Sequence, residues 1–153
     1  MGSVSGKVLF NEKIFKDITS FGGNFVGSGA FGEVYGPCIW EYKTIAIKKR
    51  MFSKDTNDDD PKLRKILGAC EKWKSLRHRN LINVYKVSFD SPALYTLMEF
   101  AEGGSLREVL RLCKSDLPPE IQMNWSTQIV DGMAYLHRKE ILHRDLKSAN
   151  SKF

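Results

Sequence analysis

Cysteine is scarce in this chain, and the few cysteines are scattered. Cys38, Cys70 and Cys113 are the three cysteines among 153 residues, and no two of them form a C-x-x-C pair. An odd and widely spaced set of this kind does not fit a disulfide framework or a structural zinc site. We therefore expect free, largely buried thiols, as in proteins of a reducing compartment.

The sequence also lacks long apolar runs, internal repeats and low-complexity tracts. No apolar run approaches the roughly 18 residues that a membrane-spanning helix needs. The first residues carry no secretory signal, and a myristoylation site would need Ser or Thr where Gly6 stands. We expect a cytoplasmic protein that has no membrane partner.

Acidic residues are outnumbered, with 18 Asp and Glu against 24 Lys and Arg, which gives a net charge of +6. Such an excess raises the question of a nucleic-acid partner. Much of the surplus falls within residues 62–79, in one predicted helix and its exit, and no nucleic-acid-binding motif accompanies it. A solvated helix face is the simpler interpretation, and we expect no binding to nucleic acid. The apolar share of 42% and the charged share of 27% are typical of a globular domain.

Short apolar segments bounded by turn residues predict several β-strands. These segments are rich in β-branched and aromatic residues, and Gly, Pro or charged residues separate them. The polar and acidic stretch 54–60 (KDTNDDD) is expected to be a loop. Strands are expected over residues 24–26, 33–39, 44–49, 81–87 and 94–100.

Three helices are expected among these strands. Asp60-Pro61 combines an N-cap residue with proline at the first helical position. The helix that follows has an apolar stripe of Leu63, Ile66, Leu67, Cys70, Trp73 and Leu76. Ser105 and Glu108 form a capping box before a short helix. Pro119 opens a longer one, whose apolar face is made of Ile121, Trp125, Ile129, Met133 and Leu136. The order of elements predicts an α+β fold rather than alternating βαβ units.

A glycine-rich segment near the start fits the pattern G-x-G-x-x-G-x-V. Dinucleotide-binding folds share its glycines, but in those folds a helix begins within the glycines. Here residues 33–37 (EVYGP) favour a second strand instead. The glycines then lie at a hairpin tip, where backbone amides can approach phosphate oxygens closely, and Phe31 would cap the turn. The candidate nucleotide-binding residues of this segment are Val26, Gly27, Ser28, Gly29, Ala30, Phe31, Gly32 and Val34.

The next predicted strand contains Ile45-Ala46-Ile47-Lys48, which matches V-A-I-K with Ile in place of Val. Strand alternation places Ala46 and Lys48 on one face, beneath the glycine hairpin. A small residue there leaves room for adenine, and a cation two residues on can meet the α- and β-phosphates. An isolated strand lysine would ordinarily be a surface residue, but the neighbouring motifs favour phosphate binding by Lys48.

The most specific segment is residues 143–150, which read HRDLKSAN and match H-R-D-L-K-x-x-N. This is the pattern of the protein-kinase catalytic loop, which places a carboxylate, a cation and an amide around the transferred phosphate. With the glycine hairpin and the strand lysine preceding it, the chain resembles the eukaryotic protein kinases over residues 24–150. The resemblance implies a small lobe over 24–98, and a hinge with the first part of a helical large lobe over 99–150. Residues 1–23 would be a lead-in, and 151–153 a non-matching tail.

The resemblance also implies roles for single residues, with ATP and Mg²⁺ as cofactors. Asp145 would accept the proton of the substrate hydroxyl, Lys147 would neutralise charge on the transferred phosphoryl group, and Asn150 would bind the metal. Met98 would lie at the back of the adenine pocket, with Glu99 and Ala101 in the hinge. His143 would support the loop.

Finer features resemble the tyrosine-kinase-like group, and within it the mixed-lineage and TGF-β-activated kinases. These features are residues 98–106 (MEFAEGGSL) and several positions within 124–137. Lys147 follows the serine/threonine pattern. The resemblance implies a MAP kinase kinase kinase that phosphorylates a downstream kinase as its protein substrate.

Two features depart from the family pattern. Relatives have a glutamate nine residues before the histidine of an L-x-H motif, and nine residues before His78 stands Ala69. Glu71 lies two residues further on, about 200° around the helix. Either a helix irregularity turns Glu71 toward Lys48, or this helix supplies no glutamate to the lysine, and we favour the second interpretation.

The other departure is at residues 151–153 (SKF), where relatives continue with an aliphatic strand and a D-F-G motif. Asn150 alone offers too few oxygens for Mg²⁺, and the helix opened by Pro119 would expose an apolar patch. We expect a truncated kinase that is inactive by itself. The alternative function is that of an inactive kinase-like fragment, a binding or regulatory module that would hold nucleotide weakly or pair with another kinase through its small lobe.

Overall fold

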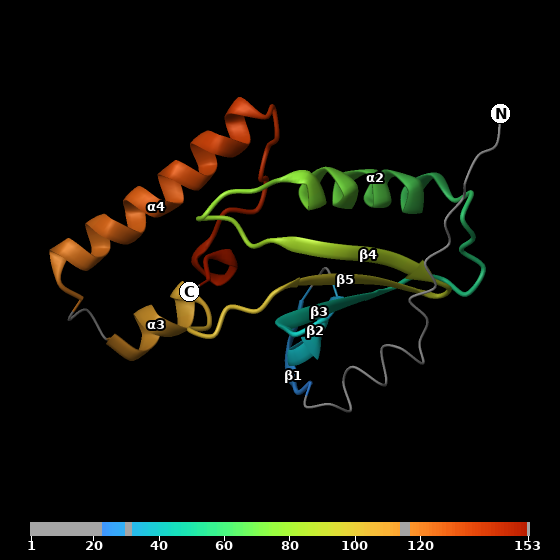
Figure 1. Cartoon of the computed structure of the whole chain (residues 1–153), viewed down its shortest axis with the longest axis horizontal. Helices are drawn as coiled ribbons and strands as arrows, with labels where there is room; N and C mark the ends of the chain where they lie inside the picture. Colours follow the sequence, from blue (N-terminus) through green and yellow to red (C-terminus); the bar gives the residue numbers. More distant parts are fainter. Residues whose placement is uncertain (1–22, 30–31, 114–116, 153) are drawn as a thin grey trace. The chain divides into compact units, whose positions relative to one another are not determined.

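The computed structural model describes residues 23–29, 32–113 and 117–152. Contacts divide the chain into two units, one formed by Met1–Leu76 with Asn83–Phe100, the other by Arg77–Ile82 with Ala101–Phe153. The fold is α+β, as the order of predicted elements indicated. The elements are β1 (Phe25–Gly29), β2 (Gly32–Trp40), β3 (Lys43–Met51), α2 (Pro61–Ser75), β4 (Val84–Asp90), β5 (Ala93–Glu99), α3 (Leu106–Cys113), α4 (Pro119–Arg138) and the 3-10 helix η1 (Ser148–Asn150) (Figure 1).

The first unit is built on an antiparallel sheet with the strand order β1-β2-β3-β5-β4 (Figure 1). Direct cross-strand partners set Gly27, Val34, Lys48 and Thr96 in one row across four strands. Gly27 of the glycine-rich segment and Lys48 of β3 therefore lie in the same cross-strand row. Because directly opposed residues point to the same face of a sheet, this row belongs to one face.

The opposite face of the sheet holds the main hydrophobic core of this unit. Ile45 and Ile47 are fully buried in it, since they alternate along β3 with Ala46 and Lys48. The alternation predicted for this strand thus separates a packed face from a face that carries the lysine. The buried members of the core are Cys38, Ile45, Ile47, Ala93, Tyr95 and Leu97, each at most 2% exposed.

α2 lies alongside β4 in the first unit (Figure 1). It begins as the sequence predicts, because the Asp60 carboxylate accepts hydrogen bonds from the backbone N–H groups of Lys62 (2.7 Å) and Leu63 (3.1 Å). Pro61 occupies the first turn, where its missing N–H is not needed. Leu63 is fully buried and anchors the start of the helix.

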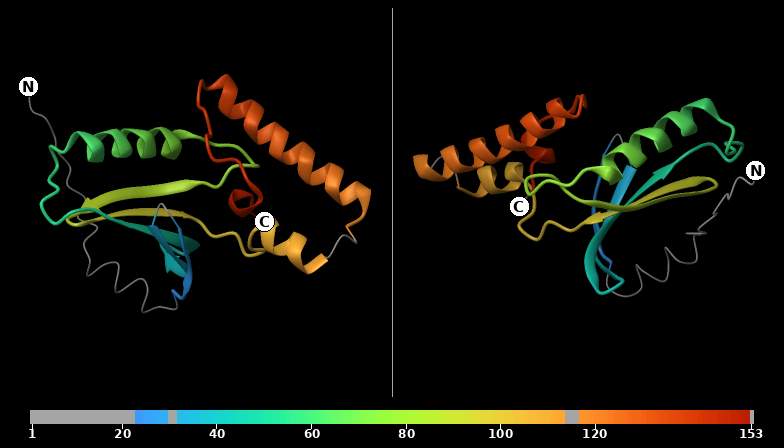
Figure 2. Two further views of the ribbon diagram at one scale, coloured as in Figure 1. Left: turned by 180° about the vertical axis from the view of Figure 1, so that it is seen from behind. Right: turned by 45° about the horizontal axis from the view of Figure 1, so that its top comes forward.

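The second unit contains the capping box and both later helices. The Glu108 carboxylate accepts hydrogen bonds from the Ser105 backbone N–H (2.7 Å) and hydroxyl (2.6 Å), and the Glu108 N–H donates to Ser105 Oγ (3.3 Å). The Leu106 N–H donates to the Ser151 carbonyl at 2.9 Å, which fastens the end of the described chain to the start of α3 (Figure 2). No helix among the described residues combines the length and apolar character needed to cross a bilayer.

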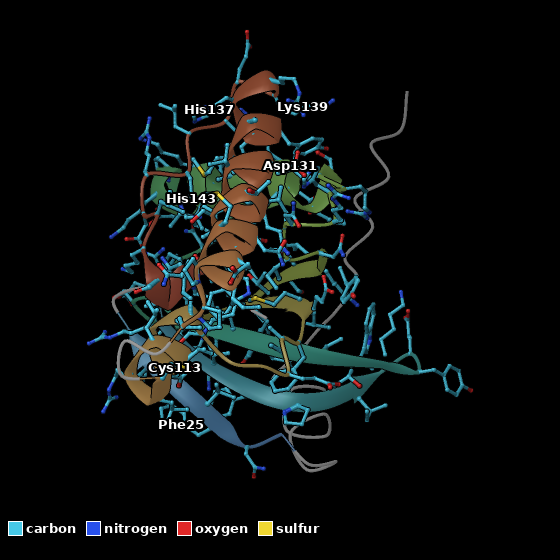
Figure 3. The ribbon with its side chains drawn as sticks, turned by 90° about the vertical axis from the view of Figure 1, so that its left-hand side faces the viewer. Phe25, Cys113, Asp131, His137, Lys139 and His143 are labelled. Atoms are coloured by element: carbon cyan, nitrogen blue, oxygen red, sulfur yellow. The ribbon has the colours of Figure 1, made fainter. Side chains whose placement is uncertain are left out.

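Several predicted strand bounds were wrong: β4 spans Val84–Asp90 and not residues 81–87, and β1 continues to Gly29 and does not end at residue 26. Residues 77–82 form instead a loop that packs on α4. Asp131 of α4, labelled in Figure 3, accepts hydrogen bonds from the side chains of Asn80 (2.9 Å) and Arg79 (3.3 Å). The Leu81 side chain lies against Gly132. The apolar side chain of Leu81 therefore packs against a helix and does not pair in the sheet.

Candidate functional site

Three side chains of the H-R-D-L-K-x-x-N segment meet in one cluster. Lys147 Nζ lies 2.8 Å from Asp145 Oδ1. Asn150 Nδ2 donates to the other carboxylate oxygen of Asp145 at 2.7 Å and to its backbone carbonyl at 2.8 Å. The residues that the sequence singled out as catalytic are therefore in direct contact with one another.

The backbone of this segment is held in a conformation that aims these groups at one another. The Asp145 N–H donates to Nδ1 of His143 at 3.3 Å, and η1 closes with an Asn150 N–H bond to the Lys147 carbonyl at 2.8 Å. Arg144 adopts a left-handed φ of 61°. A non-glycine residue keeps such a conformation only when its surroundings impose it, which is common at functional sites.

The charge environment keeps the Asp145 carboxylate ionised. The hydrogen bond from Lys147 is the main influence that lowers the pKa of Asp145 below its ordinary value, and the hydrogen bond from Asn150 acts in the same direction. The side chain remains 38% exposed, so a substrate group can reach it. An ionised and reachable carboxylate is suited to accept a hydrogen bond from a hydroxyl group.

The amide of Asn150 fits a magnesium ligand in its chemistry. Its Nδ2 serves both bonds to Asp145, so its Oδ1 is the atom that can offer lone pairs to a cation. Oxygen is the ligand that Mg²⁺ prefers. Within the described ranges no group of three or more His, Cys, Asp or Glu could hold a metal. Magnesium here would therefore take most of its ligands from phosphate oxygens and water, as it commonly does.

The glycines of the β1–β2 hairpin differ in what surrounds them. Gly32 has a φ of +115°, and a Cβ there would lie 2.2 Å from the carbonyl oxygen of Lys49, so packing requires glycine. Around Gly27 and Gly29 a Cβ would meet nothing within 4 Å. Contacts within the described structure thus explain why glycine is needed at position 32. They leave open space at Gly27 and Gly29.

The structure describes three of the five other residues predicted to bind nucleotide in this hairpin, namely Val26, Ser28 and Val34. Val26 falls where the β1–β2 register shifts, and it is 53% exposed. Ser28 lies opposite Glu33, and Val34 lies opposite Lys48. Ala30 and Phe31 lie outside the described residues, so the expected cap on the turn is not observed here.

Lys48 lines a cavity of about 120 Å³ on the face of the sheet opposite the core. Burial raises the pKa of the Cys70 thiol, and the charge of Lys48 opposes that rise. Sequence reasoning missed Arg50 and Thr96 as walls of this cavity, although strand alternation and pairing place both on the face of Lys48. The cavity is lined by Lys48, Arg50, Ile66, Cys70, Leu94 and Thr96.

Glu71 takes part in a different interaction. α2 is a continuous α-helix from Pro61 to Ser75, with no irregularity that would turn this side chain. Glu71 pairs with Lys74 one turn along, at 3.2 Å, and its side chain is 57% exposed. Cys70, one residue earlier, lines the cavity with Lys48, and so does Ile66 one turn before it.

The residues expected around adenine lie at the end of β5 and just beyond it. Met98 is directly opposite Ala46 on β3. The Glu99 carboxylate accepts two hydrogen bonds from Asn83, one from its backbone N–H (3.1 Å) and one from its side-chain amide (2.8 Å). Ala101 belongs to the second unit, where its carbonyl accepts the Gly104 N–H at 3.3 Å. Asn83 was not singled out by sequence reasoning, because no local pattern links residues so far apart.

A family model for the protein kinase domain matches residues 22–151. Human mitogen-activated protein kinase kinase kinase 10 is 33% identical over 128 residues, which cover 82% of this chain and 13% of that protein. Mitogen-activated protein kinase kinase kinase 3 of Arabidopsis thaliana is 34% identical, covering 84% and 21%. Human testis-specific serine/threonine-protein kinase 4 is 34% identical, covering 84% and 38%. The chain thus spans well under half the length of these curated relatives.

Among solved structures, the crystal structure of Rad53 1–466 in complex with AMP-PNP is similar to this chain. The TM-score is 0.72 at 29% sequence identity, and the match covers 90% of this chain and 34% of the Rad53 chain. The described residues correspond to the small lobe and the first part of the large lobe of this fold.

Proposed function

This chain belongs to the protein kinase family. On that premise we propose that it binds ATP and that its residues carry out the transfer of the γ-phosphate to serine and threonine hydroxyls of proteins. The observation that carries the proposal is the contact of Asp145 with both Lys147 and Asn150. A carboxylate, a cation and an amide in one cluster supply the three functions that phosphoryl transfer needs from a protein. The relatives named as serine/threonine kinases support the choice of acceptor.

ATP would occupy the lysine-bearing face of the first unit. The open space at Gly27 and Gly29 admits phosphate oxygens to backbone amides. Lys48 lies in the same cross-strand row as Gly27, where its charge would meet the α- and β-phosphates. Ala46 and Met98, directly opposed, would flank adenine, and the backbone of Glu99 and Ala101 would bind its edge. AMP-PNP, the ligand named for the Rad53 structure, is an ATP analogue.

In the transfer step the substrate oxygen attacks the γ-phosphorus while the bond to the leaving ADP oxygen breaks. Asp145 would orient the hydroxyl and take its proton, and the Lys147 cation would offset charge that builds on the phosphoryl oxygens. Asn150 would hold Mg²⁺ through Oδ1. The domain assignment that accompanies this proposal is a small lobe over 24–98 and a hinge with part of the large lobe over 99–150, flanked by 1–23 and 151–153.

Within the family we propose a place in signalling of the MAP kinase kinase kinase type. The substrate would be a downstream kinase, and the similarity to two named kinases of that type supports this. The cytoplasm is the proposed site of action, because Cys38, Cys70 and Cys113 are all free thiols and thiols persist in reducing compartments.

A second candidate function is that of a kinase-like binding module without transfer activity. The observation that favours it is the pairing of Glu71 with Lys74, in a regular helix that carries Ala69 where relatives carry glutamate. The strand lysine would then bind phosphates without the orienting carboxylate of the family. The kinase requires the nucleotide site, so nucleotide binding is tested first.

The test is the thermal stability of the 153-residue chain with and without Mg-ATP. A ligand at about 100 times its Kd stabilises the folded state by about 2.7 kcal/mol, which raises the melting temperature by several degrees. Lys48→Met is expected to reduce the shift strongly while leaving the unliganded melting temperature within a few degrees. A melting temperature that saturating Mg-ATP leaves unchanged in the wild-type chain would refute nucleotide binding and the kinase candidate with it.

A further inference from the structure

Asn83, which directly precedes the neighbouring strand β4, forms hydrogen bonds with Glu99, the last residue of β5. Two N–H groups of Asn83 converge on one oxygen of the Glu99 carboxylate, at 3.1 Å from the backbone and 2.8 Å from the side chain. In return the Glu99 backbone N–H donates to the Asn83 carbonyl at 2.9 Å. Both residues are half-buried, where hydrogen bonds to a charged group are stronger than at an exposed site.

These three bonds lie where the regular sheet pairing ends. Val84 pairs with Met98, and Asn83 immediately precedes that pair. On its other side Glu99 pairs with Ile45 of β3. Glu99 is thus fastened from both neighbouring strands, and the chain leaves the sheet directly after it. The hydrogen bonds of Glu99 therefore set the direction of the backbone that follows β5.

We infer that Asn83 is a positioning residue for adenine recognition, acting through the Glu99 carboxylate. The inference rests on the proposed function, in which the backbone of residues 99–101 binds the adenine edge. Hydrogen bonds of this kind lose strength when donor and acceptor rotate out of line. A carboxylate tied by two donors keeps the peptide groups around Glu99 in one orientation before the base arrives, which lowers the ordering needed on binding.

The variant that tests this is Asn83→Asp, which preserves shape but replaces the amide donor with a second carboxylate facing Glu99. Like charges at this distance repel, so the side-chain bond is lost and the end of β5 shifts. Adding Glu99→Gln to Asn83→Asp removes the repulsion and lets the Gln amide donate to the Asp carboxylate, although the donating nitrogen cannot also accept the backbone N–H that Glu99 Oε2 accepts. The double variant therefore repairs the side-chain bond without restoring either native residue, which a general loss of stability would not allow.

Affinities for ATP and for inorganic tripolyphosphate are measured by calorimetry on the full chain. Asn83→Asp is expected to weaken ATP binding about tenfold, the size of one lost charge-assisted hydrogen bond. Tripolyphosphate has no base, so its affinity is expected to stay unchanged. The double variant is expected to recover part of the lost ATP affinity, because only the side-chain bond is remade. Asn124→Asp, which introduces the same charge on an exposed turn of α4, is the matched control and is expected to bind ATP normally.

Three outcomes would overturn the inference while the wild-type chain still binds ATP. They are an unchanged ATP affinity in Asn83→Asp, an equal loss for ATP and tripolyphosphate, and no recovery in the double variant. If Asn83→Asp does not fold, as circular dichroism would show, Asn83→Ala replaces it and must weaken ATP binding selectively. A wild-type chain that fails to bind ATP removes the proposed function, and this inference falls with it.

Discussion

Gly29 and Gly32 flank the turn of the β1–β2 hairpin, but only Gly32 is closely surrounded by other atoms. An alanine at Gly32 would place its Cβ 2.2 Å from a backbone oxygen at a φ of +115°, whereas at Gly29 it would enter open space. We predict that Gly32→Ala lowers the free energy of unfolding by at least about 1 kcal/mol. Gly29→Ala is predicted to change it by less than about 0.5 kcal/mol. Urea denaturation measures both.

The same two glycine variants distinguish an effect on folding from an effect on ATP binding. Gly29→Ala is predicted to weaken ATP binding clearly, because the added methyl group occupies space that the proposal gives to phosphate oxygens. Equal ATP affinity in Gly29→Ala and wild type would show that this open space is not used by nucleotide.

Asp145 provides a second prediction at the scale of single residues. Lys147→Met removes the main influence that lowers the pKa of Asp145, so the pKa is predicted to rise toward the ordinary carboxyl value. Because the folded pKa lies below the unfolded one, the ionised pair stabilises the fold at neutral pH, and this contribution is lost as pH falls through the folded pKa. Carboxyl ¹³C NMR during a pH titration measures the change. Lys139→Met is the control, and an identical titration of Asp145 in all three proteins would contradict the prediction.

Among the secondary-structure elements, α2 is predicted to depend for its stability on the residues at its N-terminus. Asp60 is the N-cap and bonds two backbone N–H groups, so Asp60→Ala is predicted to cost about 1 kcal/mol of stability. Asp58→Ala is the matched control, because Asp58 accepts its bond from Arg64 through the backbone carbonyl, which the substitution keeps. Chemical denaturation of the two variants gives the comparison. Equal losses would mean that the cap does not determine the stability of this helix.

The elements also show where local patterns sufficed and where they failed. The proline at the start of α2, the capping box of Ser105 and Glu108, and the alternation along β3 are all encoded within a few residues, and each appears in the structure as predicted. The segment 81–83 was misassigned because an apolar run has the same appearance whether it pairs with a strand or packs on a helix. The close approach of Asn80 and Leu81 to Gly132 of α4 decided the matter.

For the molecule as a whole, the two candidate functions make different predictions. Transfer of labelled phosphate from ATP to a general protein substrate is predicted for a chain that acts as a kinase, on serine and threonine and not on tyrosine. Asp145→Asn should abolish it, because the amide cannot take the proton. ATP binding without transfer, unaltered by Asp145→Asn, would instead support the binding module. Phosphoamino-acid analysis and binding measured on the same preparations separate the two.

The amino-acid sequence by itself determined the family and the α+β class, and it supplied the candidate residues for the chemistry. It could do so because motifs and caps are short-range patterns whose spacing is set by backbone geometry. Only the tertiary structure decided which groups meet across long stretches of chain: Asn83 with Glu99, Arg50 and Cys70 with Lys48, and residues 77–82 with α4. Those contacts depend on how strands pair and how a helix packs, and side chains distant in sequence leave no local signal of such a meeting.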